Sequence, residues 1–155
     1  MNNEIRDKLS FFLGSQKSRL GVVSTVSAGN KPESAFVYFA FDEDYNIYFV
    51  TREGSRKYKN LLQNKKIAFV TATENPPQTL QLEGTAEVIH DPEEQKRLFE
   101  ELVGLASAKH FSPPISQIDE GGIQFIKISP AWIRFGNFEV RKHGNIFEMI
   151  DQKEV

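Results

Sequence analysis

The spacing of hydrophobic and polar positions predicts a chain that is mostly strand, with one helix before the first strand and two helices between later strands. Apolar residues recur every three or four positions over residues 3–14, after residue 55 and over residues 92–109, as on one face of an amphipathic helix. Asp91-Pro92-Glu93-Glu94 is a typical start for the last helix, because Asp caps free backbone N–H groups and Pro fits the first helical position.

Strands are predicted where apolar residues alternate with polar ones or form short runs between turn residues. They cover residues 18–27, 33–41, 45–50, 66–73, 78–90, 123–129, 131–135, 138–142 and 146–150. The second is almost continuously apolar, which predicts cover on both of its faces. Gly84 lies inside the fifth, where glycine often marks a bulge or a barrel bend.

Tight turns join most of these strands, and residues 112–122 form a longer irregular loop. Hairpin order of this kind favours an antiparallel β-barrel with a few peripheral helices, of the mainly β (α+β) class, over a doubly wound sheet. The last two strands flank His143-Gly144-Asn145, which has the composition of a hairpin turn. We expect one domain over residues 1–155, with a hairpin appended at 138–150.

The composition supports a single core and excludes several kinds of site. A chain of 155 residues with 39% hydrophobic residues can fold without disulfides. It has no cysteine, which excludes thiolate metal sites, iron–sulfur clusters and cysteine nucleophiles. His90, His110 and His143 have no paired spacing, so no metal site is predicted. Without a signal-peptide core or an apolar stretch of membrane-spanning length, a soluble, cytoplasmic protein is expected.

The strand over residues 45–50 is followed by a polar turn and then a helix, and this junction carries the candidate chemistry. Ser55 is placed to cap that helix, whose first N–H groups and dipole favour an anion. Arg56 and Lys57 add two positive charges, and the Arg fork matches phosphate oxygens. We call residues 54–57 and the start of the helix the cradle, and interpret it as a phosphate site.

The distribution of charge supports this interpretation over a basic surface turn ahead of an ordinary helix. Residues 52–66 hold six basic side chains and one acidic side chain, for a local charge of +5 in a chain whose net charge is −2. A positive region on an otherwise acidic protein is typical of a bound anion. The negative total argues against a general nucleic-acid-binding protein.

Several short sequences occur together in an order and spacing known from one family. They are Gly21-Val22-Val23-Ser24-Thr25-Val26, Lys31-Pro32-Glu33-Ser34-Ala35, Thr51 before Gly54-Ser55-Arg56-Lys57, Asn60-Leu61, Asn64 and Gly84. Through them, roughly residues 5–135 resemble the pyridoxamine 5′-phosphate oxidase-like, FMN-binding split β-barrel proteins.

The resemblance implies a homodimer with two FMN molecules in grooves between the subunits. It implies that Arg56 and Lys57 bind the FMN phosphate, with Ser55 or backbone N–H groups beside them. The other residues that it places against the flavin are Ala35, Phe36, Val37, Tyr38, Val50 and Thr51, with Thr79, Gln81, Trp132 and Arg134 of the partner subunit. Thr79 fits the family's spacing from Gly84, and Gln81 fits its residue type, so both remain candidates.

The implied activity is that of an FMN-dependent oxidoreductase acting on a small molecule, with a nicotinamide or another small reductant as partner. No side chain presents itself as a general acid or base, so the flavin N5 would carry the chemistry. Two departures argue against a true pyridoxamine 5′-phosphate oxidase. Ala40 stands where that enzyme has a basic residue, and its C-terminal Arg-Leu-His-Asp-Arg sequence is missing.

Two other hypotheses stay open at the level of sequence. The first is a small-barrel module for single-stranded nucleic acid, in which residues 52–66 supply charge and Tyr48, Phe49 and Tyr58 supply rings for base stacking. The second keeps the split barrel and replaces FMN by haem or a deazaflavin, because relatives with this fold accommodate such ligands.

Overall fold

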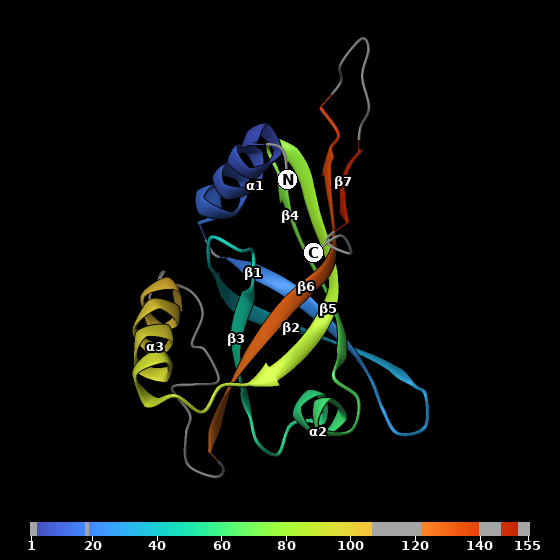
Figure 1. Ribbon diagram of the computed structural model, residues 1–155, viewed down its shortest axis with the longest axis vertical. Helices are drawn as coiled ribbons and strands as arrows, with labels where there is room; N and C mark the ends of the chain where they lie inside the picture. Colours follow the sequence, from blue (N-terminus) through green and yellow to red (C-terminus); the bar gives the residue numbers. More distant parts are fainter. Residues whose placement is uncertain (1–2, 18, 107–121, 140–146, 152–155) are drawn as a thin grey trace.

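In the computed structural model, antiparallel strands close into a barrel with helices at its ends and side (Figure 1). The structure describes residues 3–17, 19–106, 122–139 and 147–151. The helices are α1 (Asn3–Ser15), α2 (Arg56–Gln63) and α3 (Pro92–Ala106). The strands are β1 (Leu20–Val26), β2 (Pro32–Phe41), β3 (Ile47–Arg52), β4 (Lys66–Glu74), β5 (Pro77–Val88), β6 (Ile123–Asn137) and β7 (Phe147–Asp151). The predicted mainly antiparallel barrel with peripheral helices is confirmed.

The order of neighbouring strands is β3-β2-β1-β4-β5-β6-β7, and β3 also pairs with β6. That second pairing aligns Ile47 with Ile128 and Arg52 with Ile123, so it joins the sheet's two ends into a barrel of β1 to β6. β7 pairs with β6 and extends the sheet beyond the closed barrel. All described pairings are antiparallel, as expected for strands joined by short turns.

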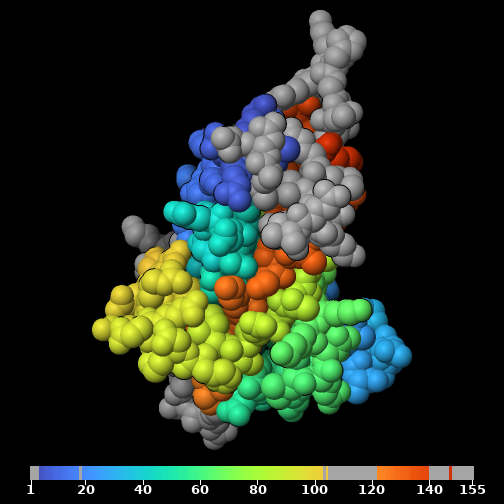
Figure 2. All heavy atoms as spheres, viewed as in Figure 1, coloured from blue at the N-terminus to red at the C-terminus, as the bar shows by residue number. Residues whose placement is uncertain are grey.

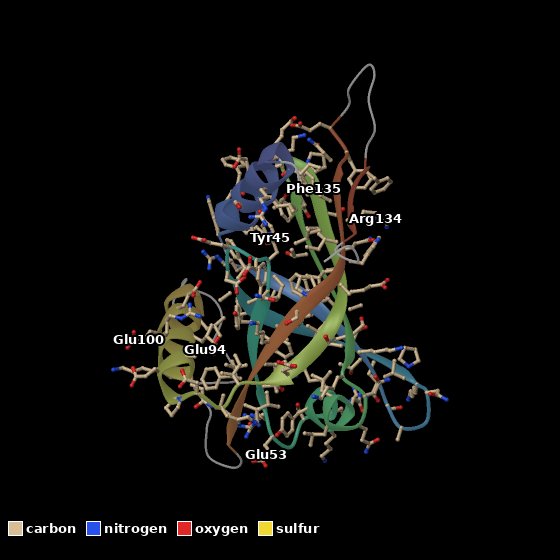
Figure 3. All side chains as sticks on the ribbon, in the orientation of Figure 1. Tyr45, Glu53, Glu94, Glu100, Arg134 and Phe135 are labelled. Atoms are coloured by element: carbon tan, nitrogen blue, oxygen red, sulfur yellow. The ribbon has the colours of Figure 1, made fainter. Side chains whose placement is uncertain are left out.

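Alternate residues of each strand fill the barrel, because successive side chains of a strand point to opposite faces. On β2, Phe39 points inward and is fully buried, whereas Phe36 points outward. α1 covers one end of the barrel, where the rings of Phe12 and Phe135 meet edge to face with 5.4 Å between centroids. Figure 3 shows Phe135 on the side of β6 that faces α1, and Arg134 on the other side.

α3 covers part of the barrel's outer face. Its Leu98 and Leu102 are buried with Tyr48 of β3 and Phe125 of β6 in a second apolar cluster. In Figure 2, α3 (yellow) and α2 (green) lie on the lower half of the face shown, with α1 (blue) at the upper end. The helices therefore leave other parts of the outer sheet surface without cover from the described residues.

Within one chain, the described residues cover only one face of the first half of β2, although its apolar sequence predicted cover on both faces. Phe36 is 73% exposed, and Val70, which follows it across the sheet through Val22, is also exposed. The cause is the position of α3, whose cluster includes Ala40 at the far end of β2. Apolar sequence alone does not show which element lies against it.

The two strands predicted over residues 123–129 and 131–135 form one strand, β6, so this prediction is wrong. Pro130 stands between the two predicted segments, and proline cannot donate a ladder hydrogen bond. In the structure Pro130 lies opposite Gly84, where the β5–β6 register shifts between Glu83 and Gly84. The predicted irregularity at Gly84 is confirmed. This shift in register allows Pro130 to lie within a continuous strand.

The predicted C-terminal hairpin has a different first strand. β7 pairs with Trp132 to Gly136 of β6. Phe138 lies outside the strands, and its backbone N–H donates to the carbonyl of Pro77 at 2.9 Å. The turn His143-Gly144-Asn145 and residues 112–121 of the loop predicted over residues 112–122 lie outside the described residues.

Candidate functional site

The junction of β3 and α2 has the geometry predicted for the cradle. Ser55 adopts an extended backbone (φ −70°, ψ 151°), and its hydroxyl accepts from the Tyr58 N–H at 3.3 Å, so it is the N-cap of α2. The same hydroxyl lies 2.8 Å from Oγ1 of Thr51, which is buried at the end of β3. This pair of hydroxyls fixes the start of α2 against the barrel.

A cavity of about 220 Å³ opens beside the start of α2. Figure 1 shows this helix next to the β1–β2 hairpin, from which the other wall comes. The lining residues are Thr25, Glu33, Ser34, Ala35, Ser55, Arg56 and Lys57. Of the predicted phosphate and flavin residues, the structure therefore brings Ala35, Ser55, Arg56 and Lys57 together around one cavity.

The two cations of the cradle differ in exposure. The Arg56 side chain is 76% exposed, whereas Lys57 is half-buried. Burial, and then the positive charge of Arg56, lower the pKa of Lys57 from its ordinary value of 10.5. Both causes disfavour the protonated amine, and a nearby anion would counter them. The cavity is thus electrostatically suited to an anionic group.

A hydrogen-bonded acid also lines the cavity beside the cradle, and sequence reasoning gave it no role there. Glu33 Oε1 is 3.4 Å from Arg56 Nη1, and Glu33 Oε2 accepts from Asn60 Nδ2 at 3.1 Å. Asn60 Nδ2 also donates to Oγ1 of the buried Thr25 at 3.0 Å. The spacing of Arg56 and Asn60 is a usable signal, because residues four apart share one helix face.

The first half of β2 presents a backbone edge beside the cradle. β2 pairs with β1 over Pro32–Tyr38, but its pairing with β3 covers only Phe39–Phe41. Among the described strands, none pairs with the other edge of β2 at residues 33–37. This opening in the barrel wall can present N–H and C=O groups to a ligand, as the resemblance implies for this strand.

Three predicted flavin residues on β2 and β3 lie away from the cavity. Val37 is buried in the barrel core. Tyr38 and Val50 are partly buried and pack against the cluster beneath α3. Phe36 lies on the outer face, and Thr51 contacts the cradle through Ser55. Within one chain, the side chains of Val37, Tyr38 and Val50 are therefore committed to packing.

The remaining four predicted residues form a separate group on the outer face of β5 and β6. Arg134 pairs with Gln81 in register and donates a hydrogen bond to its side chain. The Arg134 guanidinium also lies 5.6 Å from the centroid of the Trp132 ring and 4.7 Å from that of Phe147 on β7. Thr79 is on the same face, two residues before Gln81. Sequence reasoning missed Phe147.

The rings required by the nucleic-acid hypothesis are not available at the surface. Tyr48, Phe49 and Tyr58 are all buried, so the three cannot stack on bases.

Within the described ranges no group of three His, Asp or Glu side chains is placed to hold a metal ion. In the same ranges, every helix is too short or too polar to cross a membrane.

Solved structures share this fold at low sequence identity. General Stress Protein 26 from Bacillus anthracis is 21% identical with a TM-score of 0.65, and the match covers 85% of this chain and 93% of that one. A Clostridium acetobutylicum protein related to general stress protein 26 is 15% identical with a TM-score of 0.69, covering 99% of both chains. A haem-binding protein from Mycobacterium smegmatis is 13% identical with a TM-score of 0.66, covering 88% of this chain and 54% of that one.

These three similarities show the fold. A comparison with curated proteins found no match. The family model described as pyridoxamine 5′-phosphate oxidase matches residues 5–137, which includes all of the barrel strands and the cradle. The chain therefore belongs to the pyridoxamine 5′-phosphate oxidase family.

Proposed function

We propose that this protein binds FMN and acts as an oxidoreductase on a small molecule. The observation that carries the proposal is the cradle, in which a capped helix start, Arg56 and Lys57 line one cavity beside the open edge of β2. N–H groups at a helix start, together with Arg and Lys, are a recurrent way to bind phosphate. Membership of the family supports a flavin as the molecule that carries this phosphate.

The residues present fit the phosphate end of FMN. Arg56 and Lys57 would hold the phosphate, with the Ser55 hydroxyl and the first N–H groups of α2 beside them. Ala35 and the open edge of β2 would lie along the rest of the ligand. The cavity of about 220 Å³ in one chain is smaller than the roughly 300–1,000 Å³ typical of small-molecule sites, which favours completion by a second chain.

We propose that the second chain is another copy of this protein. Phe36, Val22, Val70, Gln81 and Arg134 follow one another in register across the outer face, from an apolar end to a polar end. An exposed apolar strip of this kind is typical of a protein interface. In one chain β1 and β4 separate Phe36 from Gln81, by about 14 Å along the sheet at ordinary strand spacing.

Within one chain, Gln81 lies across the sheet from Phe36. In a homodimer, Gln81 and Arg134 of the partner subunit could instead face the first chain's cavity. Arg134 supports such a role, because its side chain lies on the outer face of the sheet, where it donates a hydrogen bond to Gln81.

When bound, FMN would supply hydride or electron transfer. The protein's part is then to bind the phosphate at the cradle, to orient the ligand along β2, and to exclude water with apolar residues such as Phe36 and Trp132. A nicotinamide or another small reductant and a small-molecule acceptor are the proposed reaction partners. Ala40, where the true oxidase has a basic residue, argues for a substrate other than pyridoxamine 5′-phosphate.

The test compares FMN binding by the parent protein and by the double variant R56A/K57A. The parent, reconstituted with FMN, should be yellow and release FMN on heating. The double variant should bind FMN at least about a hundredfold more weakly, because it loses two charge-assisted contacts. K65A/K66A is the matched control, since it removes two exposed lysines outside the cradle cavity and should leave binding unchanged. Equal FMN affinity in all three proteins would refute the site.

Haem is the alternative ligand, and the absorption spectrum of the loaded protein distinguishes it from a flavin or a deazaflavin. His90, the histidine within the described residues, lines a different cavity with Leu61, Leu62 and Lys65. The described residues therefore place no imidazole in the cradle cavity, which favours a flavin there. A haem spectrum that persists in R56A/K57A would support the alternative.

A further inference from the structure

Glu33 is an acidic residue inside a site whose other charged residues are cations. It lies at the start of β2, directly opposite Thr25 of β1, and its side chain is only 14% exposed. A carboxylate in this position repels a phosphate in the same cavity, so its presence needs a physical reason. The hydrogen bonds that Glu33 makes supply this reason.

Arg56 and Asn60, on two successive turns of α2, both contact the Glu33 carboxylate. Asn60 is buried and donates to Glu33 Oε2 at 3.1 Å, and the same amide nitrogen donates to Thr25 at 3.0 Å. Because Thr25 and Glu33 are opposite each other in the β1–β2 ladder, the positions of both acceptors are set by the barrel. Glu33 is thus anchored independently of any ligand.

Arg56 finds no comparable anchor among the described residues. Its side chain is 76% exposed, and the contact that the structure gives it is with Glu33 Oε1 at 3.4 Å. A long exposed arginine samples many rotamers, and ordering it on ligand binding costs free energy. An acceptor that holds one arm of the guanidinium lowers this cost and leaves the other N–H groups for an anion.

We propose that Glu33 is a positioning residue, which orients Arg56 for phosphate binding. This inference rests on the proposed function of the cradle as a phosphate site. The repulsion between Glu33 and a phosphate is reduced because Arg56, which contacts the carboxylate, is exposed to water that screens the charge, and because Lys57 lines the same cavity.

The variant E33Q tests this directly. Its amide oxygen can still accept from Asn60, so α2 remains anchored, but its NH₂ group replaces the oxygen that faces Arg56. We expect FMN affinity to fall roughly three- to tenfold, while riboflavin, which lacks the phosphate, binds as it does to the parent. A purely structural role of Glu33 would weaken both flavins equally. Unchanged or tighter FMN binding in E33Q would overturn the proposal.

A double-mutant cycle shows whether the effect passes through Arg56. In the R56A background E33Q should no longer lower FMN affinity, since the residue being oriented is absent. An undiminished effect of E33Q in that background would also overturn the proposal. The thermal midpoint of each variant shows whether it remains folded.

A second measurement does not depend on flavin. The NMR signal of the Arg56 side-chain Nε–H in the ligand-free protein should be sharp and dispersed in the parent, and should move towards the free-arginine position in E33Q. Titration with inorganic phosphate should shift it at a lower concentration in the parent. If the parent binds no flavin but these differences hold, the proposed function fails and the role of Glu33 stands. Identical Arg56 signals in both proteins would reject that role.

Discussion

At the scale of single residues, Lys57 is the side chain that reports most directly on the cradle. Burial and then the charge of Arg56 lower its pKa from 10.5 in the ligand-free protein. The unfolded chain therefore holds this proton more tightly than the folded protein does. Lys57 accordingly makes the ligand-free fold more stable as the pH rises from its lowered pKa towards about 10.5.

A bound phosphate should reverse this shift, because an opposite charge favours the protonated amine. We predict that saturation with FMN raises the pKa of Lys57, measured by NMR titration of the side-chain ¹³Cε signal. The R56A variant should raise it in the ligand-free protein as well, since the positive charge that contributes to the lowered value is then absent. A Lys57 pKa at or above 10.5 without ligand would contradict the prediction.

At the scale of secondary-structure elements, the β5–β6 bulge depends on Gly84. A Cβ at this position would collide with the backbone carbonyl of Ser129, which cannot move without disturbing the ladder. We predict that G84A destabilises the protein by at least about 2 kcal/mol, measured by urea unfolding. The irregular register at this point is what allows β6 to continue through Pro130.

The matched control for this prediction is G14A. A Cβ at Gly14, inside α1, would meet nothing within 4 Å. Alanine is the better helix former, so G14A should leave stability unchanged or raise it by up to about 1 kcal/mol. If both substitutions have the same effect on the free energy of unfolding, close packing at Gly84 does not explain its presence.

At the scale of the whole molecule, the proposed homodimer predicts different outcomes at two equally exposed phenylalanines. Phe36 is 73% exposed on the outer sheet face, and Phe11 is 74% exposed on α1. F36K should weaken both self-association, measured by light scattering over a concentration series, and FMN binding, because it places a charge in an apolar interface. F11K should leave both unchanged. A parent protein that stays monomeric at high micromolar concentration would remove the basis for this prediction.

Much of the site was accessible from the sequence, because its main features are local. Ser55, Arg56 and Lys57 are consecutive, and the cap that Ser55 provides depends on backbone groups within three residues of it. The resemblance to the family added the identity of the ligand that such a site would take. The bulge at Gly84 was also predictable, since a glycine in the interior of a strand weakens it and often marks a bulge or a tight bend.

Other features could not be predicted, because they depend on contacts between residues distant in the sequence. Glu33 reaches Asn60 across 27 positions, so its place in the cradle follows from the docking of α2 on the β1–β2 hairpin. Tyr38 and Val50 have the same apolar character as residues that face a ligand, and only the position of α3 shows that they pack beneath it.

The sequence by itself determined the succession of strands and helices as far as α3, the helix starts and the cradle's charge, since these depend on periodicity, caps and residue type over short distances. The tertiary structure decided which strands close the barrel, which apolar residues stay exposed, and which acid meets Arg56. Those outcomes depend on register and packing between elements, and a one-residue slip in register reverses the face to which every side chain of a strand points.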